Sequence, residues 1–343
     1  MTPSAAGVCA ADVARAAAIL EAGGLVAFPT ETVYGLGADA ENPQALARIY
    51  QAKGRPSDHP VIVHVAPGAD LAYWADAIPV QAHQLVAAFW PGPLTLILKR
   101  NPRIPAAVSG GQDTLGLRCP AHPVAIALLR AFKNGKGGIA APSANRFGHV
   151  SPTTAQHVRD EFDMISDGPI GAILDGGPCE VGIESSIVDL SRLATHGPVL
   201  LRPGQVSAVD IGAVIGQWPG VPDGSAPRAS GTLASHYAPR TPVAMLDGGA
   251  LPAALAQLAA RGRRVALIHH SGLPAAGASV RLPAQADAYA QALYASLRAM
   301  DDAGCELILL EAPPQDAQWN GVNDRLRRAA HGSHGIIAQL LRS

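Results

Sequence analysis

Clusters of polar residues lie beside short apolar segments at three places in this chain. The cluster PTETVYGLG follows the apolar residues 25–28, APSANRFGHVSPTT lies around 140–154, and GGPCEVGIESS lies just before 185–190. Short apolar segments bounded by turn residues are typical of buried strands. Loops at the strand ends of an α/β sheet gather ligand-binding groups, because the sheet fixes the strand ends. The clusters therefore predict an α/β fold in which several loops form the walls of one pocket.

The periodicity of apolar residues predicts the elements around these clusters. Helices are expected at 11–22, 43–52, 79–89, 123–133 and 153–160. Strands are expected at 25–28, 61–65, 94–99, 114–119, 138–143, 171–176, 185–190 and 199–203. Because strands arrive both singly between helices and in a consecutive group, the order favours a twisted mixed sheet with packed helices over a purely parallel sheet.

The chain of 343 residues exceeds the usual size of one compact domain, so two domains are expected. Residues 218–241 are rich in proline, glycine and small polar residues without periodicity, which is typical of a linker. The first domain is then 1–217. In 242–343, the apolar segments PVAML, RRVALIHH and CELILLEAP alternate with helical patterns. This alternation predicts a small Rossmann-like α/β domain.

Charge and cysteine content restrict the class of protein. The chain has 26 Lys plus Arg against 27 Asp plus Glu, a net charge of -1, which favours neither a nucleic-acid coat nor a membrane surface. The four cysteines form no CxxC pair, so neither a zinc site nor a disulfide framework is expected. No apolar stretch approaches the roughly 18 residues of a membrane span. We therefore expect a cytoplasmic protein without a metal site of its own.

The segment KGRP places two cations close together after a predicted helix. Lys53 and Arg55 flank Gly54, so both side chains can converge on one anion such as a phosphate group. The alternative is an exposed pair that complements the helix dipole. Neither a Walker A sequence nor a GxGxxG fingerprint is present, so a nucleotide would not be bound by those loops.

The segment PSAN supplies a second group of polar side chains. Ser143, Asn145 and the helix opening at Ser151 can hold a phosphate or a ribose, or can serve as ordinary caps and turns. By itself, His64 would be a core histidine and Arg118 a surface ion-pair partner. Ser185 follows a glutamate, yet no GxSxG elbow accompanies it, which argues against a nucleophilic serine.

The ordered series of motifs resembles the YrdC-like threonylcarbamoyl-AMP synthases. The series is FPTETVYGLG, KGRP, FWPGPLTLIL, GLRCP, APSAN with SPT, DGG, GIESSIVD and LRPG, over about residues 10–210. HYAP in the tail resembles the long form with an extra C-terminal domain. The resemblance implies a nucleotidyltransferase that converts L-threonine, bicarbonate and ATP into threonylcarbamoyl-adenylate and diphosphate. It also implies magnesium that enters with ATP, and a product passed to the machinery that transfers threonylcarbamoyl groups to tRNA.

The resemblance also implies roles for individual residues. Catalysis is assigned to Lys53 and Arg55 through charge on the ATP phosphates. Threonine is assigned to Thr32, His64, Arg118 and Ser185, with the backbone of Ala141 lining the same pocket. ATP is assigned to Arg55, His59, Thr114, Ser143, Asn145, Ser151, Arg202 and Tyr237. Tyr237 lies in the predicted linker, so it either closes over the pocket mouth or packs on the second domain.

Two departures and two alternative functions remain. Ser186 replaces a threonine of many relatives, and RASGTLASHYAP lacks the basic residues often found before HYAP. A double-stranded RNA-binding module is an alternative, because isolated domains of this fold are associated with such RNA and a local basic rim is compatible with the net charge. A carbamoyl-adenylate transferase of the hydrogenase-maturation type is the other, although the paired CxxC motifs of that larger protein are missing.

Overall fold

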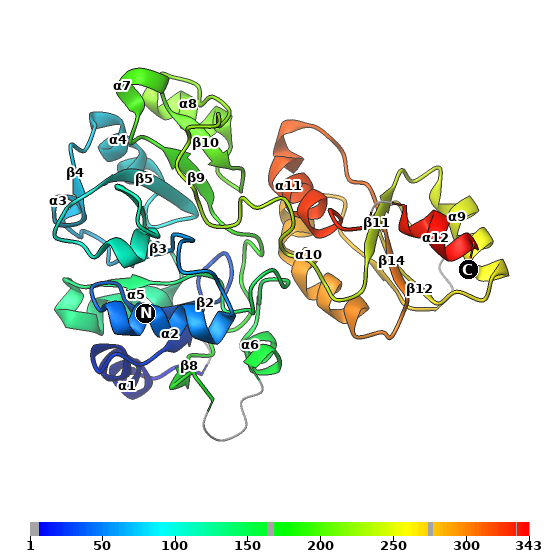
Figure 1. Cartoon of the computed structure of the whole chain (residues 1–343), viewed down its shortest axis with the longest axis horizontal. Helices are drawn as coiled ribbons and strands as arrows, with labels where there is room; N and C mark the ends of the chain where they lie inside the picture. Colours follow the sequence, from blue (N-terminus) through cyan, green and yellow to red (C-terminus); the bar gives the residue numbers. More distant parts are fainter. Residues whose placement is uncertain (1–6, 163–167, 274–276, 334, 343) are drawn as a thin grey trace. The chain divides into compact units, whose positions relative to one another are not determined.

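The computed structural model describes residues 7–162, 168–273, 277–333 and 335–342, which form two compact units (Figure 1). The first unit comprises the described residues of Met1–Phe147, Pro152–Glu180 and Glu184–Thr232. The second comprises those of Gly148–Ser151, Val181–Ile183 and Leu233–Ser343. The residues predicted as a linker are thus divided between the units at Thr232 and Leu233. Each unit has its own sheet.

The described part of the first unit contains a ten-stranded sheet in the order β10-β9-β5-β6-β3-β7-β2-β1-β8, with β4 paired to β5. Its strands are β1 (Val26–Phe28), β2 (Gly35–Asp39), β3 (Ile62–Val65), β4 (Ala75–Asp76), β5 (Leu94–Arg100), β6 (Thr114–Arg118), β7 (Gly138–Ala140), β8 (Ala172–Ile173), β9 (Ser186–Asp189) and β10 (Val199–Arg202). The pairs β1–β8, β3–β6 and β5–β9 are parallel. The other pairs are antiparallel. The predicted mixed sheet is confirmed.

Helices cover both faces of this sheet. They are α1 (Ala10–Glu21), α2 (Pro43–Lys53), α3 (Leu71–Trp74), α4 (Val80–Phe89), α5 (Pro123–Ala131), α6 (Ala155–Phe162), α7 (Leu193–His196) and α8 (Ala208–Ile215). Because successive strand residues point to opposite faces, Phe28 packs with Leu20 of α1 and Leu128 of α5. Its neighbour Ala27 packs instead in the core that contains Ile49 of α2. Both faces are therefore buried, and polar groups collect at the strand ends.

Strand β2 was not predicted, because its sequence GLGAD is rich in glycine. A Cβ atom on Gly37 would lie 2.8 Å from both Ile139 Cγ2 and Phe28 Cε1. Glycine at this position therefore permits close packing of β1, β2 and β7, although it lowers the strand propensity that a sequence pattern detects. The polar residues 30–33 form the connection between β1 and β2, which are antiparallel neighbours.

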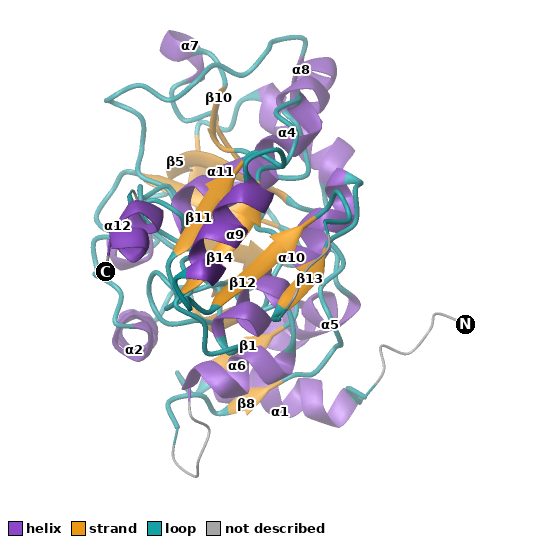
Figure 2. Ribbon diagram, turned by 90° about the vertical axis from the view of Figure 1, so that its right-hand side faces the viewer, coloured by secondary structure: helices purple, strands orange, loops and turns teal. Residues whose placement is uncertain are grey.

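The second unit contains a four-stranded sheet in the order β11-β14-β12-β13, whose paired strands are all parallel (Figure 2). The strands are β11 (Val243–Leu246), β12 (Val265–His269), β13 (Ser279–Arg281) and β14 (Leu307–Glu311). The helices are α9 (Leu251–Ala260), α10 (Ala286–Asp301), α11 (Asn320–Ala329) and α12 (Ile336–Arg342). The prediction of a small α/β domain is confirmed by this parallel sheet and its helices, which are compatible with the Rossmann-like arrangement that was expected. None of the helices in the described ranges has the length and apolar character needed to cross a membrane.

Candidate functional site

The guanidinium group of Arg118 lies buried at the end of β6 and donates hydrogen bonds to three residues from two segments. Nε donates to the carbonyl of Gly92 at 3.2 Å, and Nη1 donates to Thr32 Oγ1 at 2.9 Å. Nη2 forms an ion pair with Glu31 Oε1 at 2.6 Å. The isolated reading of Arg118 as a surface residue is therefore wrong, because its side chain is about 5% exposed. Thr32, which the resemblance also assigns to threonine, lies beside it.

His64 on β3 is the direct neighbour of Arg118 in the parallel register of β3 and β6. The imidazole is buried, and its Nδ1 makes no hydrogen bond to a residue that the structure describes. Burial and the positive charge of Arg118 lower the pKa of His64 to about 3. The ring is therefore neutral near pH 7, so Nδ1 can accept a hydrogen bond or donate one, depending on the tautomer.

Ser185 is held from two sides just before β9. Thr95 Oγ1 lies 2.8 Å from Ser185 Oγ, and Arg202 donates to the hydroxyl at 3.2 Å and to the carbonyl at 3.0 Å. Neither threonine nor arginine acts as a general base near neutral pH, so these contacts do not activate Ser185 as a nucleophile. A Cβ atom on Gly204 would lie 2.6 Å from the Ser186 nitrogen. Glycine in LRPG therefore lets this backbone pass close to Ser185.

Lys53 ends helix α2 and reaches the PSAN segment. The helix begins after Asn42, whose side chain caps it, and ends at Gly54 in the left-handed conformation. Nζ of Lys53 donates to the carbonyl of Ser143 at 2.6 Å and to the carbonyl of Asn145. Burial and the nearby charge of Arg55 hold the pKa of the Lys53 ammonium group well below its usual value. The structure thus brings KGRP and PSAN together.

Arg55 and His59 share an aromatic partner. The Arg55 guanidinium lies 5.7 Å from the ring centroid of Phe147, and the His59 ring meets the same ring edge to face at 5.3 Å. Nη2 of Arg55 also donates to the carbonyl of Pro60 at 2.9 Å and to Ser230 Oγ at 3.3 Å. Burial, followed by the charge of Arg55, lowers the pKa of His59.

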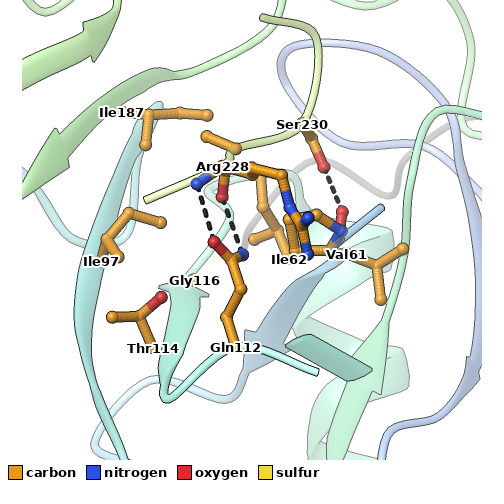
Figure 3. Close-up of a pocket in the computed structure, with 11 residues that line it drawn as sticks. Val61, Ile62, Ile97, Gln112, Thr114, Gly116, Ile187, Arg228 and Ser230 are labelled. Carbon is orange, nitrogen blue, oxygen red and sulfur yellow. Dashed lines mark hydrogen bonds between the residues drawn. The ribbon is translucent and has the colours of Figure 1, made fainter. Parts of the chain in front are cut away.

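A pocket with both apolar and polar lining residues, Thr114 among them, includes Pro60 and Ser230, which accept hydrogen bonds from Arg55 (Figure 3). The residues that line it are Pro60, Val61, Ile62, Ile97, Gln112, Thr114, Gly116, Ile187, Arg228, Ala229 and Ser230. Gln112 binds the backbone of Arg228 at both ends: Arg228 N donates to Oε1 at 2.8 Å, and Nε2 donates to the Arg228 carbonyl at 3.1 Å (Figure 3). Ser230 Oγ donates to the carbonyl of Pro60 at 2.8 Å. Arg228 and Ser230, shortly before Thr232, are thus hydrogen-bonded to the first unit.

Ala141 directly follows β7, and its N–H donates to the carbonyl of Ile62 at 3.0 Å. Ser151 and Tyr237 belong to the second unit. Tyr237 is buried there, with its ring 5.8 Å from that of Tyr294 and 5.4 Å from the Arg325 guanidinium. Tyr237 therefore packs within the second unit, which is one of the two arrangements expected from the sequence. Its assignment to ATP stays a prediction.

Sequence reasoning missed four residues that contact the predicted ones: Glu31, Thr95, Phe147 and Ser230. Glu31 stood inside the quoted motif PTET but received no role. Thr95 was concealed in the apolar run LTLIL, because a hydroxyl in a buried strand gives no periodic signal. Ser230 was treated as linker sequence. Each becomes visible only when distant segments are placed side by side.

The first unit thus combines a mixed sheet with buried arginines at the ends of β6 and β10, and with hydroxyl groups in the adjoining loops. Residues 18–204 match the family described as telomere recombination, and residues 206–331 match the C-terminal domain of threonylcarbamoyl-AMP synthase. The chain belongs to the threonylcarbamoyl-AMP synthase family, in its long two-domain form.

Relatives cover nearly the whole chain. A threonylcarbamoyl-AMP synthase of Pyrococcus abyssi is 39% identical over 92% of this chain and 93% of its own length. The threonylcarbamoyl-AMP synthase of Bacillus subtilis is 40% identical over 93% of this chain and 93% of its own length. The crystal structure of P. abyssi Sua5 complexed with L-threonine has a TM-score of 0.86 at 37% identity, over 94% of this chain and 95% of that one. The resemblance stated from the motifs is confirmed.

Proposed function

We propose that this chain converts L-threonine, bicarbonate and ATP into threonylcarbamoyl-adenylate and diphosphate. The observation that carries the proposal is the pairing of Arg118 with His64 on adjacent strands of a unit whose whole-chain relatives are threonylcarbamoyl-AMP synthases. The P. abyssi Sua5 structure is a complex with L-threonine, which supports this ligand. The match to the C-terminal family model favours the synthase over an RNA-binding module or a hydrogenase-maturation transferase.

The threonine half of the proposed site uses Arg118 for the substrate carboxylate. A guanidinium binds a carboxylate through two parallel N–H groups, which fixes its orientation as well as its charge. Thr32, His64 and Ser185 then supply neutral polar contacts for the side chain and the amino group. Because burial keeps His64 uncharged near neutral pH, it adds no second positive charge beside the amine.

The ATP half uses Lys53 and Arg55 for the phosphates, with Ser143, Asn145 and Thr114 nearby. The amino group of L-threonine and bicarbonate first combine to the carbamate N-carboxythreonine with loss of water. A carbamate oxygen then attacks the α-phosphorus, the bond between the α-phosphorus and the oxygen that bridges to the β-phosphate breaks, and diphosphate leaves with the electron pair. The carbamate is itself the nucleophile, so this step needs orientation and charge stabilisation more than a covalent enzyme intermediate. The class of enzyme is accordingly a nucleotidyltransferase.

Magnesium is proposed to enter as part of the ATP substrate. Within the described ranges, no group of three His, Cys, Asp or Glu side chains is placed to hold a metal ion. Magnesium retains water and binds readily through substrate phosphates, so such a protein cage is not required. We further propose a cytoplasmic protein that passes its adenylate to the machinery for threonylcarbamoylation of tRNA.

Mass spectrometry of the products tests the proposal. Purified protein with magnesium, ATP, L-threonine and bicarbonate should form threonylcarbamoyl-adenylate and equimolar diphosphate. Omission of threonine or of bicarbonate should abolish both products. Diphosphate release without threonine, or formation of ADP and free phosphate, would contradict the proposed reaction.

A further inference from the structure

Glu31 is the one charged residue of the PTET motif, and the proposed function gives it no part. Its side chain is about 6% exposed, in the connection between β1 and β2. Oε1 accepts the 2.6 Å hydrogen bond from Arg118 Nη2, and Oε2 accepts a hydrogen bond from the backbone N–H of Ala121 at 3.0 Å. Both carboxylate oxygens are therefore engaged, one by the cation of the threonine site and the other by the loop after β6.

The two threonines on either side of Glu31 fix the loop that carries it. Thr30 Oγ1 donates to the carbonyl of Val33 at 2.7 Å and accepts from the N–H groups of Thr32 and Val33 at 3.2 Å each. The same oxygen lies 2.9 Å from Thr32 Oγ1, which in turn accepts from Arg118. Glu31 and Thr32 therefore meet neighbouring nitrogens of one guanidinium group from a turn that Thr30 closes.

Arg118 has five N–H bonds, and three of them are used by Gly92, Thr32 and Glu31. One N–H bond on each terminal nitrogen has no partner among the residues that the structure describes. Two such N–H groups are the donors that a carboxylate needs for a two-pronged contact. The existing contacts thus orient the guanidinium and leave these two donors for a ligand.

We propose that Glu31 is a positioning residue for L-threonine. Its carboxylate holds Arg118 in the orientation that presents the two remaining N–H groups to the substrate carboxylate, and it offsets the cost of burying the cation. A buried guanidinium without an anionic partner is costly and reorients toward other acceptors or solvent. This inference rests on the proposed function for the identity of the ligand. Glu31 acts through Arg118 and needs no contact with threonine.

The test compares two ligands on the intact chain carrying Glu31→Gln. Titration calorimetry measures L-threonine, and saturation-transfer NMR measures L-threoninol, which lacks the carboxylate. The variant should bind L-threonine roughly tenfold more weakly or worse, because a charge-assisted contact to Arg118 is lost. L-Threoninol binding should be unchanged, because it does not use the guanidinium fork. A purely structural role would weaken both ligands alike.

Asp39→Asn is the matched control. Asp39 is a buried carboxylate of the same unit, paired with Lys133 at 2.8 Å on another part of the sheet. This variant should lose stability while keeping wild-type affinity for L-threonine. If Glu31→Gln does not fold, the same two ligands are measured with Glu31→Asp. This variant keeps the negative charge, but its shorter side chain cannot contact Arg118 and Ala121 at the same time.

Three results would overturn the inference. The first is an unchanged affinity for L-threonine in the Glu31 variant that folds, and the second is an equal loss of affinity for L-threonine and L-threoninol. The third is tighter binding of L-threonine, which would mean that Glu31 competes with the substrate for Arg118. Failure of the wild-type chain to bind L-threonine is a different outcome, because it contradicts the proposed function itself and this inference with it.

Discussion

Lys53 and Ser143 are 90 residues apart in sequence, yet the Lys53 ammonium nitrogen lies 2.6 Å from the Ser143 carbonyl oxygen. A buried cation that rests on uncharged carbonyls has no counterion in these two contacts, and its pKa is held well below the usual value. An incoming triphosphate would place negative charge beside Lys53. The contact therefore connects helix α2 to the loop after β7 at the point where the proposed site needs a phosphate-binding group.

Lys53→Met should reduce adenylate formation roughly a hundredfold, because a charge-assisted phosphate contact is lost. Binding of L-threonine should stay at the wild-type level, since Lys53 is assigned to the phosphates. Steady-state rates and threonine titrations measure the two effects. Lys99→Met is the control, because Lys99 is a half-exposed partner of Asp113 in the same unit. Equal rates in wild type and Lys53→Met would refute the assignment.

Arg118→Lys should raise the KM for L-threonine roughly tenfold or more, while the KM for ATP stays nearly constant. Lysine keeps the charge beside Glu31 but cannot offer a two-pronged contact to a carboxylate. Initial rates at varied concentrations of each substrate measure both constants. A defect in ATP use with an unchanged threonine dependence would show that Arg118 serves the nucleotide instead.

His64 should make the stability of the fold depend on pH. In the unfolded chain this histidine takes up a proton below about pH 6.5, whereas the native pKa is about 3. Between these values the unfolded state binds more protons, so the contribution of neutral His64 is complete above pH 6.5 and is lost as the pH falls toward 3.

Urea unfolding at pH 7.5 and pH 5 measures this effect in wild type and in His64→Gln. The wild-type protein should lose more unfolding free energy between the two pH values than the variant does. His59 and His122 also have lowered pKa values and remain in both proteins, so the difference isolates His64. An identical pH dependence in the two proteins would mean that the native imidazole is not held neutral.

Gly204→Ala should destabilise the first unit by a few kcal/mol and impair adenylate formation. The added Cβ would lie 2.6 Å from the Ser186 nitrogen and 2.8 Å from the Glu184 carbonyl oxygen, so the backbone on both sides of Ser185 must move. Thermal unfolding and product formation measure the two effects. In the control Gly220→Ala, the nearest atom is 3.9 Å away, and that variant should behave like the wild type. Similar results for both variants would refute the argument.

Local patterns predicted most of the first sheet and all but one strand of the second. The apolar runs that became β3, β5 and β6 are long enough to detect, whereas β2 contains two glycines, and β13 is a short strand whose Ser279 and Arg281 are exposed. The prediction of β8 over 171–176 was too long, because only Ala172 and Ile173 pair with β1. Strand pairing is a tertiary property, and a local pattern does not specify how many residues find a partner.

The site was predicted through the ordered motifs and not through any single residue. Taken alone, His64 was expected in the core, and the structure does bury it. Taken alone, Arg118 was expected on the surface, since a lone arginine seldom enters a core. Its buried guanidinium is paired with Glu31, which lies 87 residues away in sequence. This ion pair arises from the fold, and the sequence around neither Arg118 nor Glu31 indicates it.

The second unit is built from three separate segments of the chain, and this affects which truncated fragments of the protein can fold. Val150 and Gly182 precede Leu233 by many residues in sequence, yet both belong to the second unit and contact its helix α10. Arg298 of α10 donates a hydrogen bond to the Val150 carbonyl. Gly182 lies so close to α10 that a Cβ atom added to it would be 2.4 Å from Gln291 Cα. A fragment beginning at Leu233 would lack both segments and would expose the backbone that Gly182 covers. Recombinant expression of this C-terminal fragment alone should therefore give an aggregation-prone, poorly soluble product, even though all four strands of its parallel sheet lie within the fragment.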